Sequence, residues 1–294
     1  MTAKKGYSQE SEVPSFFARI IFFSIWFVTL SAFGCLAFLV YRAYQVEVRA
    51  RTNNQQVHMA SFLQGEMGKK TTEEMKAAII IDDLGRDIEI VKKILKLNIP
   101  VTLSVLPYRR YSGEISRMAS QRGYDVLLHL PMQPRKYPEV NPGPGCLLLS
   151  MDQEEIQAEL MAQIKLFPYC VGVNNHMGSI FIEKKDPMRW ILSVLRGQGL
   201  FFVDSLTTPD TVAPQLAREL GVLFTKRTHF LDDKRDEDYI IRQLCDLIDY
   251  TVQHGTAVGI GHPFEETLAA LPKVMAAFKQ KGIRLVPVSE LVMH

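Results

Sequence analysis

The sequence predicts an α/β fold with a parallel sheet: a TIM-like barrel of seven or eight strand–helix units, complete or missing one unit. Residues 77–81 are apolar or small at every position, as strands buried on both faces of parallel sheets are. Further short apolar runs alternate with helical patterns through the rest of the chain. Several of these runs end in an aspartate or a histidine, where parallel α/β folds place their sites. A doubly wound open sheet is the alternative.

The strands are predicted from short apolar runs bounded by turn residues or by the start of a helical pattern. The second run stops at Pro107, and the fourth is followed by the polar segment NNHMG. The predicted strands are residues 77–81, 101–106, 126–128, 171–173, 200–203, 222–224 and 257–260, with 285–288 as an eighth strand or a closing extension.

The helices are predicted from apolar residues that recur every three or four positions between the strands, as at residues 88–95. Ser150 and Gln153 predict a capping box before one helix, and Asp186 predicts the N-cap of the next. A long helix over residues 236–254 is predicted to end at a glycine.

The amino-terminal part of the chain differs from the rest. Residues 20–41 carry no charge and are long enough to cross a bilayer as one helix, so we expect an uncleaved, single-pass anchor in lipid. A cleaved signal peptide is the alternative, but its apolar core would be shorter and followed by a small-residue cleavage site. Positive charges balance on the two sides of the segment, so charge does not set its orientation. The predicted divisions are a tail (1–19), the transmembrane anchor (20–41), a linker (42–76) and a folded domain (77–294).

Composition and missing motifs argue against several functions. The formal net charge is +2, so no large basic surface for nucleic acid is implied. Neither a G-x-G-x-x-G sequence nor a P-loop follows the first strand, which leaves nucleotide binding without support. The cysteines are widely spaced and form no CxxC pair, so the sequence predicts no disulfide framework.

The residues at the strand ends predict the site. Parallel strands bring their carboxyl ends together, so these residues should share one cleft. One aspartate with two histidines is a workable zinc site with an open position for water. A neighbouring carboxylate can then remove a proton and a histidine can protonate a leaving group, which suits hydrolysis of an amide or ester. The alternatives are a helix cap for an aspartate and structural hydrogen bonding for each histidine. The residues concerned are Asp82, Asp83, His129, His176, Asp204 and His262.

Six segments, in order along the chain, resemble the divergent polysaccharide deacetylase family: IIIDDLG, LLHLPMQP, VNPGPG, VGVNNHMGS, FFVDS and GIGHP. The resemblance runs from Ala77 to the C-terminus. It implies a NodB-like (β/α) barrel of the carbohydrate deacetylase superfamily. It also implies Asp82 as the general base, Asp83 and His129 as metal ligands, and His262 as the general acid.

The sequence departs from the better-known deacetylases at two places. The second motif of those enzymes is H-x-x-x-H-P. This sequence has Gln133 at the position of the second histidine, in a loop rich in proline and glycine. Where an Arg-x-Pro motif is expected, the sequence has NNH, and we expect His176 at its end to be the third metal ligand. Asn174, Asp204 and Arg227 are expected to face the substrate, with Asp204 orienting a partner in the site. A solvated turn is the alternative for Arg227.

The expected function is a membrane-anchored deacetylase that depends on a divalent metal, expected to be Zn²⁺, and acts on an acetylated polysaccharide or peptidoglycan-like glycan. Its domain is expected on the periplasmic side of the cytoplasmic membrane, because the family resembled acts on glycans. The alternative is a catalytically silent glycan-binding or envelope-scaffold module. Gln133 favours that alternative, whereas Asp82, Asp83 and His262 favour the enzyme. Glycoside cleavage needs two carboxylates that flank the bond, which adjacent aspartates do not obviously supply.

Overall fold

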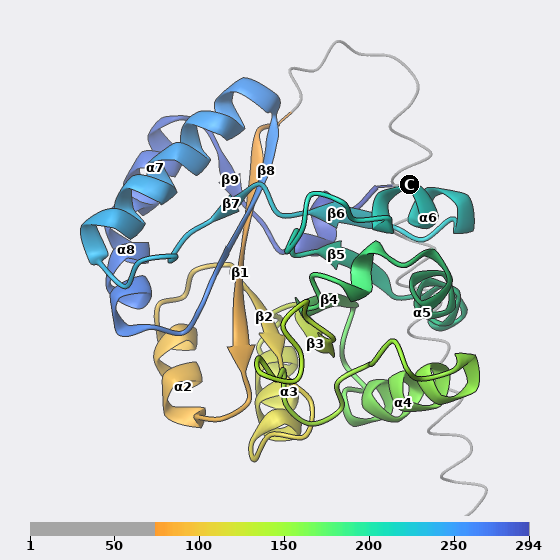
Figure 1. Cartoon of the computed structure of the whole chain (residues 1–294). Coiled ribbons are helices and arrows are strands. Elements are labelled where there is room, and N and C mark those ends of the chain that lie inside the picture. Colours follow the sequence, from red (N-terminus) through yellow and green to blue (C-terminus); the bar gives the residue numbers. More distant parts are fainter. Residues whose placement is uncertain (1–73, 294) are drawn as a thin grey trace, which may run out of the picture. The chain divides into compact units, whose positions relative to one another are not determined.

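The computed structural model describes residues 74–293, whose strands form one curled sheet (Figure 1). The predicted tail, the anchor at residues 20–41 and nearly all of the linker lie outside these residues. Within residues 74–293, no helix is both long enough and apolar enough to span a bilayer.

The sheet is parallel throughout, as predicted from its continuously apolar first strand. Its strands lie in the order β6-β5-β4-β3-β2-β1-β8-β7, and β9 pairs with the start of β1. The bounds are β1 (Lys76–Leu84), β2 (Thr102–Val105), β3 (Val126–Met132), β4 (Gly172–Met177), β5 (Phe201–Asp204), β6 (Phe224–Lys226), β7 (His229–Phe230), β8 (Thr256–Gly261) and β9 (Arg284–Leu285).

The sheet curls as an incomplete barrel rather than as a complete TIM barrel. Only Arg227 and Thr228 separate β6 from β7, whereas parallel neighbours need a crossover of about a dozen residues or more. These two short strands therefore pair with different partners, β6 with β5 and β7 with β8. A single extended segment, residues 224–230, therefore lies at the place where a closed barrel would have longer strands that pair with each other. The barrel is therefore incomplete, one of the two forms that the sequence predicted, and it is not a complete TIM barrel.

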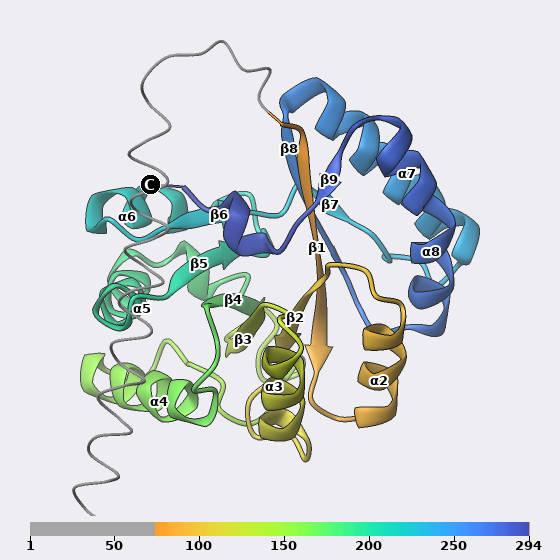
Figure 2. The ribbon, with the colours of Figure 1, turned by 180° about the vertical axis from the view of Figure 1, so that it is seen from behind.

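The helices surround the outside of the curled sheet (Figures 1 and 2). Two predicted helix starts were misplaced: the capping box of α4 is Asp152 with Glu155, and the N-cap of α5 is Lys184. Helix α7 has Asp236 as its N-cap and Gly255 as its C-cap, which agrees with the helix predicted over residues 236–254. The bounds are α2 (Ile88–Lys96), α3 (Ser112–Gln121), α4 (Gln153–Leu166), α5 (Lys185–Gln198), α6 (Ala213–Leu220), α7 (Glu237–His254) and α8 (Glu265–Gln280), with short 3-10 helices η1 (Phe181–Glu183) and η2 (Val288–Leu291).

Two apolar clusters cover the two faces of the sheet. The larger cluster joins alternate strand residues to the helices, and Ile79 and Ile81 of β1 belong to it. The smaller, inner cluster fills the inside of the curl and takes Ile80 from β1, Leu127 from β3 and Ile260 from β8. Side chains alternate between the faces of a strand. Residues two positions beyond members of the inner cluster therefore also face inward.

The C-terminal segment is a closing extension, one of the two possibilities that the sequence left open. After the two-residue strand β9, Val286 donates a backbone hydrogen bond to Ala77 at the start of β1. Val286, Val288 and Leu291 belong to the inner cluster. Apolar side chains therefore fill the amino-terminal end of the curl, and the polar residues gather at the other end.

Candidate functional site

Asp82 and Asp83 both reach the site because β1 ends irregularly. Asp82 lies two positions beyond Ile80 and so faces inward with it. In a regular strand Asp83 would face the helices. However, the pairing of β1 with β2 shifts between Ile81 and Leu84, and Asp83 has a φ of 60°. This bulge turns the second carboxylate toward the site, and its left-handed backbone stores strain of a kind that clusters at functional sites.

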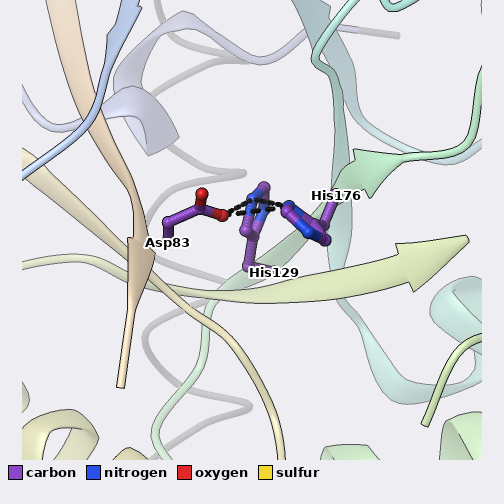
Figure 3. A group of neighbouring side chains, drawn as sticks. All are labelled: Asp83, His129 and His176. Carbon is purple, nitrogen blue, oxygen red and sulfur yellow. Dashed lines mark hydrogen bonds and ion pairs between the residues drawn. The ribbon is translucent and has the colours of Figure 1, made fainter. Parts of the chain in front are cut away.

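His129 and His176 extend from the neighbouring strands β3 and β4 toward the carboxylate of Asp83 (Figure 3). Asp83 Oδ1 lies 3.2 Å from His129 Nε2 and 2.9 Å from His176 Nδ1. The two ring nitrogens are 3.1 Å apart. The three residues predicted as metal ligands therefore present one oxygen and two nitrogens to a common point.

The surroundings of Asp83 keep its carboxylate ionised. Asp83 Oδ1 is buried and accepts no hydrogen bond, although two imidazoles lie beside it. Burial raises the pKa of Asp83, but His129 and His176 outweigh that effect and hold the pKa well below its usual range. Burial lowers the pKa of His176, whereas for His129 the effect of burial is outweighed by Asp82 and Asp83, which raise its pKa. A carboxylate that stays ionised beside nitrogen lone pairs is suited to a divalent metal.

The donor set fits zinc. Ligand atoms about 2.0–2.2 Å from a tetrahedral zinc ion lie roughly 3.3–3.6 Å from one another. The observed separations, 2.9–3.2 Å, are slightly shorter, so small rotations of the rings are sufficient to admit the ion. Asp83, His129 and His176 would hold the metal, the set predicted from the sequence, with His176 in place of the absent second histidine of the H-x-x-x-H-P motif.

Gln133 is not part of this cluster. Its side-chain Oε1 accepts a hydrogen bond of 2.8 Å from the backbone N–H of Leu149, and its own backbone N–H bonds to Leu147. The side chain thus fastens the far end of the proline- and glycine-rich loop to β3. Because His176 is placed to supply a third ligand, Gln133 does not by itself argue for a silent module.

His262 faces the cluster from β8 and has a partner that the sequence reasoning missed. Its Nδ1 lies 2.9 Å from Oδ1 of the buried Asp232, and its Nε2 lies 4.0 Å from Asp83 Oδ2. Asp232 also accepts hydrogen bonds from the His262 backbone and from Thr267. Burial lowers the pKa of His262, but Asp232 and the site aspartates outweigh it and raise the pKa to about 8. A protonated His262 can therefore donate from Nε2 near neutral pH.

Asn174 belongs to the site but is fully buried. It lies opposite His129 in the β3–β4 pairing. Its amide contacts the side chains of Asp82, Ser104, His129 and Ser205. These contacts use both acceptor and both donor positions of the amide, so no position is left for the expected contact with substrate.

Asp204 and Arg227 support the loop after β5 rather than the chemistry. Asp204 lies two positions beyond Phe202, whose side chain packs toward the helices. Because side chains alternate between the two faces of a strand, the carboxylate of Asp204 also points away from the inner face. One oxygen of this carboxylate accepts a hydrogen bond from the Leu206 backbone. Arg227 donates to the carbonyl oxygens of Ser205 and Leu206. Asp232, not Asp204, orients a partner in the site.

A surface pocket of about 310 Å³ opens beside the cluster. Asp83 forms part of its wall, together with residues from the β1–α2 turn and from the start of α8. Of the three clustered residues, Asp83 alone lines this pocket, so the pocket adjoins one edge of the cluster. The lining residues are Asp83, Leu84, Gly85, Arg86, Asp87, Ile90, Pro263 and Glu265.

Solved structures share this fold. An uncharacterized protein, ATU2773 from Agrobacterium tumefaciens C58, is 25% identical with a TM-score of 0.70, and the match covers 76% of this chain and 92% of that chain. The Bc1960 peptidoglycan N-acetylglucosamine deacetylase is 13% identical with a TM-score of 0.50, over 75% of this chain and 89% of that one. At that identity the second match shows the fold alone.

The family is identified at the level of sequence. An uncharacterized protein of Haemophilus influenzae is 31% identical over 214 residues, which cover 73% of each chain. Residues 79–292 match the family described as divergent polysaccharide deacetylase. That match includes every residue of the proposed site, so the chain belongs to the divergent polysaccharide deacetylase family.

Proposed function

We propose that this protein is a metal-dependent hydrolase that removes acetyl groups from a glycan of the cell envelope. The observation that carries the proposal is the placement of Asp83, His129 and His176 between Asp82 on one side and the His262–Asp232 pair on the other. A site for binding alone needs no proton acceptor and proton donor around such a cluster. The family and the shared fold support an acetylated glycan as the substrate.

Asp82 is proposed as the general base. Its Oδ1 accepts a hydrogen bond of 2.8 Å from Asn174 Nδ2, whereas Oδ2 lies on the side of the cluster, 3.7 Å from His129 Nε2. Oδ2 is therefore the oxygen that takes the proton from the attacking water. Asp82 is 3% exposed, which limits competition from bulk solvent.

His262 is proposed as the general acid. Its Nδ1 is held by Asp232, so Nε2 is the atom that presents a proton to the site. That proton passes to the amine or hydroxyl of the sugar as the bond to the acetyl carbon breaks, and acetate is the other product. A divalent metal bound by Asp83, His129 and His176 would polarise the acetyl carbonyl and lower the pKa of water.

The direct test is acetate release by the purified full-length protein, loaded with zinc, from a panel of N-acetylated and O-acetylated glycans. Peptidoglycan fragments belong in the panel because a peptidoglycan deacetylase shares the fold. Release that depends on the metal supports the proposal and identifies the acyl linkage. Binding of a glycan without release, at zinc saturation, would instead favour the silent glycan-binding module.

The pH profile should identify His262 and its partner. Because only the protonated imidazole donates, we expect kcat/KM to fall as pH rises through about 8, the raised pKa of His262. In Asp232→Asn the carboxylate that favours the imidazolium is lost, so the pKa falls and the alkaline limb moves to lower pH. The acidic limb serves as the internal control. An alkaline limb that stays in place in this variant would contradict the assigned pairing.

We further propose that residues 20–41 anchor the protein in the cytoplasmic membrane, with the domain on the outer side. The uncharged 22-residue length of this segment and the envelope glycan proposed as substrate support this placement. The expected result is that the domain is digested by protease added to spheroplasts and that the mature chain retains the segment. A protected domain, or a mature N-terminus beyond Tyr41, would refute it.

A further inference from the structure

Asn174 connects the proposed base to one of the proposed metal ligands. Its side chain is 0% exposed and lies between Asp82 and His129 on the inner face of the sheet. Four side-chain groups surround its amide: Asp82 Oδ1 at 2.8 Å, Ser205 Oγ at 3.3 Å, Ser104 Oγ at 2.6 Å and His129 Nδ1 at 3.0 Å.

The carboxylate of Asp82 fixes the orientation of this amide. A carboxylate only accepts hydrogen bonds, so the Asn174 atom that faces it must be the NH₂ group. The carbonyl oxygen then faces Ser104 and His129. A carbonyl oxygen only accepts, so both of these groups must donate to it.

The orientation of the amide therefore selects the tautomer of His129. With its proton on Nδ1, the neutral ring has its lone pair on Nε2. Nε2 is the atom that faces Asp83 Oδ1 and His176 Nδ1. The opposite tautomer would place a proton on Nε2, the atom that has to bind the metal.

We propose that Asn174 is a positioning residue that keeps His129 in the tautomer able to bind metal and holds Oδ1 of Asp82, which leaves Oδ2 to act as the base. In this role it competes with Asp83 for the ring proton of His129. The inference rests on the metal site of the proposed function. The state of the imidazole can nevertheless be measured without metal and without substrate.

The test is a long-range ¹H–¹⁵N correlation spectrum of the metal-free, full-length protein labelled at histidine. Burial lowers the pKa of His129, but Asp82 and Asp83 outweigh it and raise the pKa, so the pH is increased until the ring is neutral. We expect the wild-type His129 ring to be protonated at Nδ1 and bare at Nε2. In Asn174→Leu, which is close to Asn in size and cannot hydrogen-bond, we expect the proton to move to Nε2. We also expect zinc affinity to fall by about 10- to 100-fold, as when other partners of metal-bound histidines are removed.

Ser205→Ala is the matched control, because it removes a 3.3 Å contact to the NH₂ group and leaves the carbonyl oxygen of Asn174 in place. It should keep the wild-type tautomer and zinc affinity. A wild-type His129 protonated at Nε2 would overturn the proposal, whether or not Asn174→Leu folds. An unchanged tautomer and zinc affinity in a folded Asn174→Leu protein would also overturn it.

The two proposals fail separately. If the tautomer and the zinc affinities behave as expected but no acetate is released, the proposed activity is wrong and the role of Asn174 stands. If acetate is released but Asn174→Leu leaves the ring and the affinity unchanged, only the role of Asn174 is wrong.

Discussion

Replacing Asp83, His129 or His176 with alanine should remove most of the bound metal and, with it, at least 99% of acetate release. Each substitution takes away one of only three protein ligands, and the two that remain cannot hold a zinc ion in the open, tetrahedral arrangement that hydrolysis needs. Metal content by elemental analysis and initial rates of acetate release, measured on the same samples, give the result.

Gln133→Ala is the control for this prediction, because it changes the position where better-known deacetylases have a ligand. The Gln133 side chain bonds to the Leu149 backbone and not to the cluster. The variant should therefore keep its metal, although the loop that Gln133 fastens would be less firmly held. Loss of metal from Gln133→Ala together with retention in His176→Ala would show that His176 does not replace the absent histidine.

Asp82→Asn and His262→Ala should keep the metal and lower turnover by roughly a hundredfold or more, the usual contribution of acid–base catalysis. Neither residue belongs to the proposed ligand set. In Asp82→Asn the new amide oxygen can still accept the hydrogen bond from Asn174, so the local packing is preserved. In His262→Ala the group that protonates the departing sugar is lost. The measurements are kcat at zinc saturation and zinc stoichiometry.

His229→Ala is the matched histidine control for His262→Ala. The His229 ring is hydrogen-bonded to the hydroxyl of Thr228 and packs edge-on against Tyr250 of helix α7. Its removal should leave kcat within about threefold of wild type, because a lost hydrogen bond of this kind affects folding rather than the reaction. Equal losses of turnover in His229→Ala and His262→Ala would mean that the assignment of the acid is wrong.

Simple alternation along the strands accounts for much of the site. Asp82, His129 and His262 each lie two positions beyond an inward-facing residue: Ile80, Leu127 and Ile260. This spacing is visible in the sequence, and it places the three residues on one face. The same rule places Asp204 on the opposite face, with Phe202. The sequence prediction for Asp204 failed because it considered the end of the strand and not the side to which the residue points.

Other features of the site depend on backbone irregularities and long-range pairing. Alternation would turn Asp83 outward, and only the bulge near the end of β1 brings it into the cluster. Asp232 follows the two-residue strand β7, which is too short to be predicted as a strand. A weak signal was present, since the apolar residues Phe230 and Leu231 precede two aspartates, as at the end of β1. Asp232 comes into contact with His262 because β7 pairs with β8.

The zinc content of the purified full-length wild-type protein, after exposure to micromolar zinc and removal of the free ion, tests the central claim most directly. Asp83 Oδ1 is buried without a hydrogen bond and lies beside two imidazoles, a set of donors suited to a divalent cation. Our account predicts about one zinc ion per chain, bound by Asp83, His129 and His176. A wild-type protein that retains no zinc, while its fold is intact, would contradict the account and leave the silent glycan-binding module as the better explanation.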